Sequence, residues 1–152
     1  MKDFREMKRQ GQKITALTAY DYPTARLLDE SEIDIILVGD SLGMVVLGYS
    51  DTTRVTLDEM LYHTRAVARG VKHALLVADM PIHTYDTPDQ ALKTAKQFVD
   101  VGAQAVKLEG GASRITQIEA ITQAGIPFMA HIGMLPQTVR EEGGYKVKGR
   151  TQ

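Results

Sequence analysis

The sequence contains no cysteine, so disulfide bonds and thiolate metal sites are excluded. It also lacks an uninterrupted apolar stretch of the length that a membrane span needs. The 18 Lys and Arg residues nearly balance the 19 Asp and Glu residues, and no long basic block offers an electrostatic footprint for nucleic acid. We therefore expect neither a membrane nor nucleic acid as a partner, and a small molecule instead.

The first residues, MKDFREMKRQGQKI, are charged and are not followed by the apolar core of a signal peptide. Together with the absence of cysteine, this start predicts a cytoplasmic protein. The hydrophobic content of 43% is ordinary for a soluble globular protein. We expect residues 1–152 to form a single domain.

Short apolar runs alternate along the chain with stretches of helical spacing. The runs predict five strands, in KITALTAYD, DIILVGD, HALLVADM, AQAVKLEGG and IPFMAHIG. Between them we expect four helices, over residues 22–31, 57–69, 88–101 and 112–124. Strict alternation with short connections implies right-handed crossovers and a parallel sheet, which is either a (βα) barrel or an open doubly wound sheet.

Capping residues mark the ends of the expected helices. Thr56 and Glu59 have the spacing of a capping box. Thr87 precedes Pro88, a residue suited to the first helical turn because an N–H there would be unsatisfied in any case. Three helical runs are each followed by a glycine that we expect in the left-handed conformation of a helix end, at positions Gly70, Gly102 and Gly125.

Every expected strand ends in a side chain with ionisable or hydroxyl chemistry. One such residue alone is usually a turn former or a helix cap. Repetition over five strands instead indicates a ligand site, because the carboxyl ends of parallel strands converge on one mouth in both candidate folds. The residues are Asp21, Asp40, Ser41, Asp79, Lys107, Glu109 and His131.

A magnesium ion explains the carboxylates best. Asp40, Asp79 and Glu109 would project from three adjacent strands and supply hard oxygen ligands, leaving positions for water and substrate. Zinc fits less well, because cysteine is absent and the four histidines have no HExxH-like spacing.

Lys107 and Glu109 lie two residues apart, so in an extended strand their side chains share one face. A lysine beside a metal ion would be repelled unless an anion lay between them. We therefore expect Lys107 to be the counter-ion of a substrate carboxylate. Two alternatives stay open, a plain ion pair with a carboxylate and a Schiff-base lysine that attacks a carbonyl.

Four segments, DSLGMVVLGYSDT, VADMP, AVKLEGG and HIGMLPQ, occur in an order and at separations that closely resemble the ketopantoate hydroxymethyltransferase family. The resemblance covers nearly the whole chain. It implies a TIM (βα)8 barrel of the phosphoenolpyruvate-utilising type and a homo-oligomer, which is decameric in well-known members. It also implies transfer of a hydroxymethyl group from 5,10-methylenetetrahydrofolate to α-ketoisovalerate in pantothenate and coenzyme A biosynthesis.

The same resemblance assigns roles to individual residues. Asp40, Asp79 and Glu109 would hold magnesium, Ser41 and Lys107 would contact the oxo acid, and His131 would lie nearby. The metal would bind the keto oxygen and the carboxylate of the substrate, so that removal of the neighbouring C–H proton gives a stabilised enolate. Asp40 and Asp79 would thus also border the substrate.

The length of the chain departs from the family. A complete barrel takes roughly 250 residues, so we expect only the first five strands and four helices here, truncated after the fifth strand. The family's proposed catalytic base, a glutamate, is expected beyond residue 152, and no residue here inherits that role. A non-catalytic ligand-binding or assembly fragment is therefore a second possibility.

Overall fold

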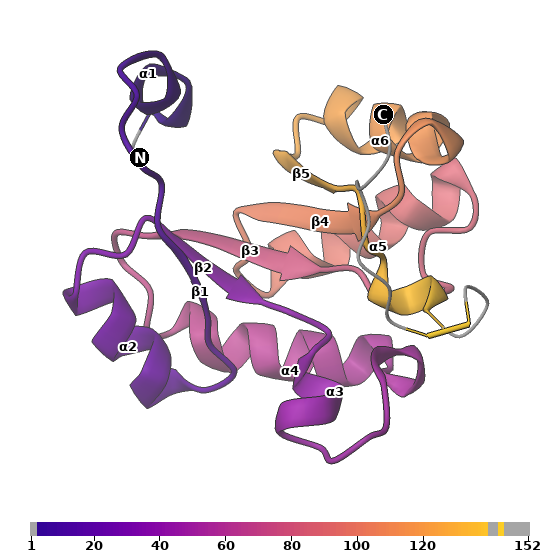
Figure 1. Ribbon diagram of the computed structural model, residues 1–152, viewed down its shortest axis with the longest axis horizontal. Coiled ribbons are helices and arrows are strands. Elements are labelled where there is room, and N and C mark those ends of the chain that lie inside the picture. The colour runs from indigo at the N-terminus through magenta and orange to yellow at the C-terminus, as the bar shows by residue number, and fades with distance from the viewer. Residues whose placement is uncertain (1–2, 140–142, 145–152) are drawn as a thin grey trace.

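The computed structural model describes residues 3–139 and 143–144, and its centre is a five-stranded sheet (Figure 1). All neighbouring strands are parallel, and their spatial order is β1-β2-β3-β4-β5. The strands thus lie side by side in the order in which they occur along the chain, as in a barrel, whereas a doubly wound sheet reverses its strand order at a switch point. The strands are β1 (Ala16–Thr18), β2 (Ile35–Val38), β3 (Leu75–Asp79), β4 (Ala105–Glu109) and β5 (Phe128–His131).

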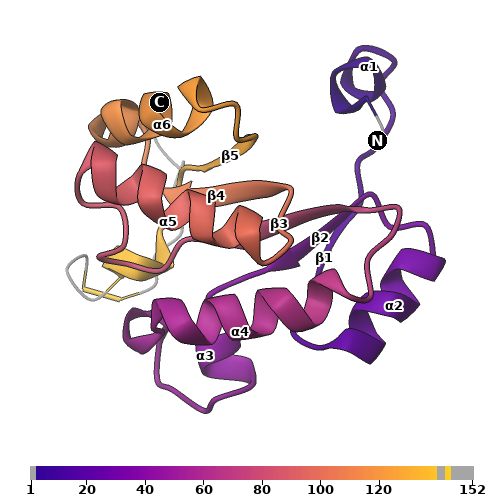
Figure 2. The same cartoon turned by 180° about the vertical axis from the view of Figure 1, so that it is seen from behind.

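The four predicted helices are present, and they pack side by side in chain order, α2 against α4, α4 against α5, and α5 against α6 (Figure 2). They are α2 (Tyr22–Glu30), α4 (Leu57–Ala68), α5 (Pro88–Asp100) and α6 (Ile115–Gln123). The last begins later than predicted, because a 3-10 turn, η2 (Ala112–Arg114), precedes it. No helix in the described ranges combines the length and apolar character needed to cross a membrane.

Four further elements were not predicted. They are the helices α1 (Phe4–Arg9) and α3 (Leu42–Val45), and the 3-10 turns η1 (Thr52–Arg54) and η3 (Pro136–Thr138). Two of them, α3 and η3, follow directly on strands β2 and β5 and therefore border the carboxyl ends of the sheet.

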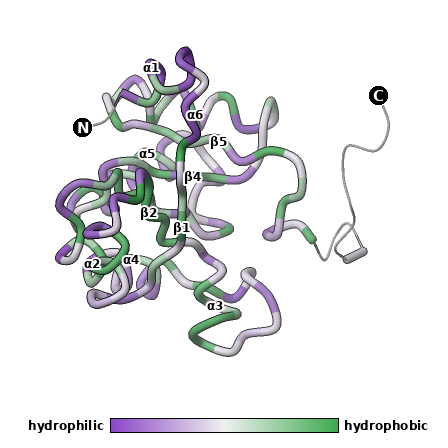
Figure 3. The backbone as a smooth tube through the Cα atoms, turned by 60° about the vertical axis from the view of Figure 1, so that its left-hand side comes forward, coloured by the Kyte–Doolittle hydropathy of each residue, from purple (hydrophilic) through white to green (hydrophobic). Residues whose placement is uncertain are grey.

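The main hydrophobic core lies between the sheet and the helices. Ile36 and Val38 of β2 belong to it, together with Phe98 of α5, and all three are fully buried. Alternate strand residues such as Ile35 and Val77 form a second, smaller cluster. Because β2 is buried on both faces it reads as one continuous apolar run, which Figure 3 shows as a hydrophobic segment.

The capping predictions hold at both sites. The Thr56 hydroxyl accepts from the Glu59 backbone N–H at 3.3 Å, and a Glu59 carboxylate oxygen accepts from the Thr56 N–H at 2.7 Å. Thr87 accepts from the backbone N–H of Gln90 at 3.2 Å, ahead of Pro88. These contacts fix where α4 and α5 begin, and hence the loops that lead away from the site.

The glycine predictions hold at two positions and fail at the third. Gly102 and Gly125 have φ angles of 109° and 77°. Gly70 does not have a positive φ; there a Cβ atom would lie 2.8 Å from the carbonyl oxygen of Tyr22. Glycine is needed at position 70 because α2 packs too closely for any side chain, and not because of a left-handed turn.

Candidate active site

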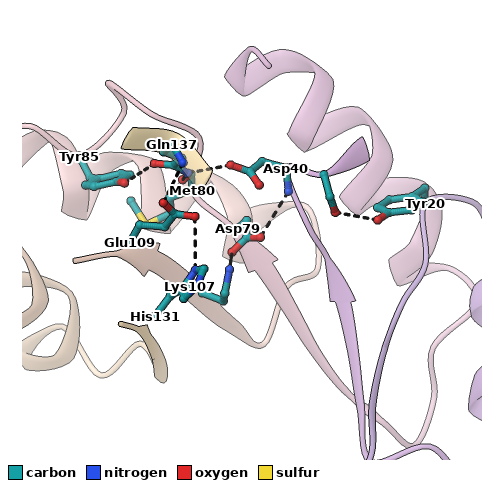
Figure 4. A network of polar contacts seen from close by, with 10 residues as sticks. Tyr20, Asp40, Asp79, Met80, Tyr85, Lys107, Glu109, His131 and Gln137 are labelled. Carbon is teal, nitrogen blue, oxygen red and sulfur yellow. Dashed lines mark hydrogen bonds and ion pairs between the residues drawn. The ribbon is translucent and has the colours of Figure 1, made fainter. Parts of the chain in front are cut away.

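The carboxyl ends of β2, β3, β4 and β5 bring together Asp40, Asp79, Lys107, Glu109 and His131 (Figure 4). These residues lie far apart in the sequence and meet because each one ends or follows a strand of the parallel sheet. Ser41 lies at the border of the cluster. The remaining strand-end residue of the sequence prediction, Asp21, is the exposed N-cap of α2 and accepts from the backbone N–H of Thr24.

Asp40 follows β2 and is 5% exposed. Its backbone N–H donates to Oδ2 of Asp79 at 3.3 Å, so the ends of β2 and β3 are joined by the carboxylate of β3. The next residue, Ser41, lies with its hydroxyl 2.8 Å from the hydroxyl of Tyr20, which follows β1. The first three strand ends are therefore linked through polar contacts.

Lys107 forms an ion pair with Asp79 on the neighbouring strand, and its Nζ donates to Oδ1 of that carboxylate. The two residues are register partners of β3 and β4, so the sheet itself sets their pairing. The side chains are 13% and 6% exposed, which removes most of the solvent screening that weakens a surface pair.

His131 lies opposite Glu109 on the neighbouring strand, with Nδ1 at 3.3 Å from Oε1. The contact does not have hydrogen-bond geometry, and Nδ1 is buried without a hydrogen-bond partner among the described residues. Burial, and then the charge of Lys107, lower the pKa of His131, so the imidazole is neutral near pH 7. The contact with Glu109 is therefore not an ion pair at that pH.

Gln137 of η3 is a site residue that the sequence prediction missed. It is 4% exposed. Its Nε2 donates to Oδ2 of Asp40 at 2.8 Å and to the carbonyl oxygen of Met80 at 3.0 Å, and its backbone N–H donates to Oε2 of Glu109 at 3.0 Å. The Tyr85 hydroxyl donates to its Oε1. Its place in HIGMLPQ, six residues after His131, was the one available signal.

Burial raises the pKa of all three carboxyl groups, and repulsion by a neighbouring carboxylate adds to the rise at Asp40 and Glu109. Burial, followed by the charge of Asp79, raises the pKa of Asp40 to about 6. Burial raises the pKa of Glu109 to about 7, against a lowering by the N–H of Gln137 and with a further rise from Asp40. Burial also raises the pKa of Asp79, although Lys107 opposes the shift. A positive charge placed among them would reverse these shifts.

The donor chemistry of the cluster suits a divalent cation. When ionised, three carboxylates stand against one ammonium, that of Lys107, among the described residues, so two negative charges are left uncompensated within this part of the chain. All the acidic donors are hard oxygens. Within the described residues, however, no three acidic or histidine side chains are close enough together to hold one ion directly. A cation bound here would thus be reached in part through water, as is usual for Mg²⁺.

Comparison with known proteins identifies the relatives of the chain. A family model described as ketopantoate hydroxymethyltransferase matches residues 1–152. The 3-methyl-2-oxobutanoate hydroxymethyltransferase of Acetivibrio thermocellus is 57% identical over 150 residues, which cover 97% of this chain and 53% of the relative. That of Clostridium novyi is 54% identical over 151 residues, which cover 98% and 55%. The chain thus spans about half the length of these relatives.

Solved structures show the same fold. Phosphonopyruvate hydrolase, in a complex with oxalate and Mg²⁺, aligns with a TM-score of 0.71 at 17% identity, over 92% of this chain and 53% of that one. Phosphoenolpyruvate phosphomutase from Streptomyces platensis aligns with a TM-score of 0.68, also at 17% identity, over 83% and 51%. The predicted TIM-barrel fold is confirmed over the first five strands. The chain belongs to the ketopantoate hydroxymethyltransferase family.

Proposed function

We propose that the chain acts in the transfer of a hydroxymethyl group from 5,10-methylenetetrahydrofolate to α-ketoisovalerate, which gives ketopantoate. The names of the relatives support this activity. The observation that carries it is the buried cluster of Asp40, Asp79 and Glu109 with Lys107 at the carboxyl ends of the strands. Assembly into a homo-oligomer and a cytoplasmic location remain predictions from the sequence.

Lys107 is the group that would bind the carboxylate of the oxo acid. An ammonium has three donors, and in this structure one of them is directed to Asp79. The remaining donors can reach an anion in the same mouth, where low exposure makes a charge-assisted hydrogen bond strong. The ion pair uses the lysine as a charge, whereas an amine that attacks a carbonyl must be neutral, so it supports the counter-ion role over a Schiff base.

We assign Mg²⁺ to Asp40, Asp79 and Glu109, with some of these oxygens acting through water. When bound, the ion would polarise the keto group of the substrate. The uncompensated charge of the carboxylates supports this assignment. The phosphonopyruvate hydrolase that shares the fold was solved with Mg²⁺ and oxalate, a dicarboxylate that also presents adjacent oxygens to a cation.

The remaining side chains hold the substrate rather than move its proton. Ser41, whose hydroxyl is paired with Tyr20, would contact the oxo acid from the β2 side. His131 would border it from the β5 side as a neutral imidazole. We assign the removal of the C3 proton to none of the described residues, in keeping with the sequence prediction that the base is a glutamate beyond residue 152.

The test is Mg²⁺-dependent binding of α-ketoisovalerate, with Mg²⁺ and the oxo acid titrated by calorimetry, because we assign the base needed for turnover to none of the described residues. Asp79→Asn is expected to weaken Mg²⁺ binding sharply and, with it, the binding of α-ketoisovalerate. The matched control is Asp29→Asn, because Asp29 is also buried but binds the backbone of residues 72–74 away from the site. Unchanged Mg²⁺ affinity in both Asp79→Asn and Asp40→Asn would refute the metal assignment.

A further inference from the structure

Gln137 connects the ends of three strands, β2, β3 and β4. Its side chain reaches Asp40 after β2 and the backbone of Met80 after β3, while its own N–H reaches Glu109 at the end of β4 (Figure 4). The strands that carry the two acids are not neighbours, because β3 lies between them. One residue thus sets how the carboxylates of Asp40 and Glu109 lie relative to each other.

The orientation of the Gln137 amide is determined by its partners. Both hydrogens of Nε2 are used, one on the Asp40 carboxylate and one on the carbonyl oxygen of Met80. Oε1 accepts from the Tyr85 hydroxyl, which is itself buried. A flipped amide would direct its oxygen at a carboxylate and a carbonyl oxygen, neither of which can donate, so these two acceptors fix the direction in which Gln137 donates. The Tyr85 hydroxyl, which donates to Oε1, then holds the side chain in that orientation.

We propose that Gln137 is a positioning residue of the metal site, which presents the carboxylates of Asp40 and Glu109 to a divalent cation and is itself oriented by the hydroxyl of Tyr85. This inference rests on the proposed function, because it assumes that the same carboxylates bind Mg²⁺. A carboxylate has two oxygens with about four acceptor sites, so one hydrogen bond from Gln137 leaves capacity for a cation or its water. Hydrogen bonds to ligating carboxylates commonly support metal affinity in this way.

The opposite role is also chemically conceivable and makes the opposite prediction. If Gln137 only occupied the acceptor sites of the acids in the absence of metal, it would compete with the cation, and removal of its amide would strengthen binding. The network favours positioning, because the amide holds Asp40 through a single oxygen and is tied by two further bonds to Met80 and Tyr85, which are not metal ligands.

The experiment is calorimetric titration of the full chain with Mg²⁺, with no substrate present. Gln137→Met keeps the length of the side chain, removes the amide and leaves the backbone N–H in place. We expect the dissociation constant for Mg²⁺ to rise by about 10- to 100-fold, the range usual for the loss of a residue that orients a metal ligand. An unchanged or lower dissociation constant overturns the proposal.

Tyr85→Phe supplies a second variant that keeps the ring in place. It removes only the hydroxyl that orients Gln137, so a weaker effect in the same direction is expected. In the double variant with Gln137→Met, Tyr85→Phe should have no additional effect, because its influence passes through the amide. Additive effects would show that Tyr85 acts by another route and would overturn that part of the proposal.

The matched control is Gln117→Met. Gln117 is also a buried glutamine, and its Nε2 donates to the carbonyl oxygen of Asp86 at 3.0 Å. Among the described residues it forms no hydrogen bond with Asp40, Asp79 or Glu109. Its loss should lower thermal stability without changing Mg²⁺ affinity. If the unaltered chain binds no Mg²⁺, the proposed function itself fails; if it binds Mg²⁺ and only Asp79→Asn weakens binding, the role of Gln137 alone is refuted.

Discussion

Replacement of Lys107 by methionine should reveal how much the buried ion pair contributes to the metal-free protein. Lys107 and Asp79 are 13% and 6% exposed, so methionine would leave a buried carboxylate without its counter-ion. Removing one partner of a buried pair commonly costs about 3–5 kcal/mol. We expect about 3 kcal/mol here, because the lysine retains some exposure, and therefore a melting temperature about 10 °C lower.

The loss of stability in Lys107→Met should depend on pH, because the unpaired carboxylate of Asp79 can bind a proton. Burial already raises its pKa, and removal of Lys107 removes the group that opposes the shift. An acid whose pKa is raised in the folded state contributes stability that is present at low pH and is lost as the pH rises through the folded pKa. The variant Lys107→Met should therefore be much less destabilised at pH 5 than at pH 8.

The assay is thermal unfolding in the presence of a chelator, with two comparison variants. Adding Asp79→Asn to Lys107→Met should restore at least half of the loss at pH 8, because asparagine carries no charge and can still accept from the Asp40 N–H. Arg26→Met removes an exposed pair with Glu30, at 3.0 Å, and should change the melting temperature far less than Lys107→Met does, because solvent screens the exposed pair. Equal stability of the single and double variants would refute the reasoning.

Three further predictions concern charge, covalent chemistry and local folding. With a chelator present, the free energy of unfolding should fall as the pH rises from about 4 to about 7. The reason is that Asp40 and Glu109, with pKa values raised to about 6 and about 7 in the folded protein, hold protons that the unfolded chain releases in this range. Denaturant titrations should show the fall, and added Mg²⁺ should oppose it. Borohydride in the presence of α-ketoisovalerate should leave the chain's intact mass unchanged; an adduct on Lys107 would establish the Schiff-base alternative. Thr56→Ala should lower the free energy of unfolding by about 1 kcal/mol, measured in denaturant, because it removes half of a capping box.

The sequence predicted the parallel sheet well because its signals are local. The apolar run before Asp40 contains only β-branched residues and leucine, and the helices begin at residues such as Thr56 whose side chains close the first turn. Each strand end could therefore be found one strand at a time. The convergence of Asp79 and Glu109 then followed from parallel topology, without any knowledge of side-chain contacts.

Features that depend on close packing between distant segments were not predictable in this way. Gly70 looks like any glycine after a helix, and only the approach of α2 shows why no Cβ fits there. Gln137 follows a proline in a segment without helical or strand periodicity, where a buried glutamine has no signal, and its partners lie as far away as Asp40, 97 residues earlier. A residue such as Gln137 is identified only in the structure, when an acceptor is sought for each buried hydrogen-bond donor.

The charge balance of the cluster links the fold to the proposed chemistry. A protein that needed these acids only for structure could pair each with a cation. In the part of the chain that the structure describes, however, Asp40, Asp79 and Glu109 share the ammonium of Lys107, and the neutral imidazole of His131 adds no charge near pH 7. Without metal, the fold accommodates this excess by raising the pKa of Asp40 to about 6 and of Glu109 to about 7. Those raised values oppose folding at neutral pH, since the acids must either ionise in a buried site or hold a proton. A divalent cation would supply the two missing charges and remove the penalty, so ligand binding and stability of this site should be coupled.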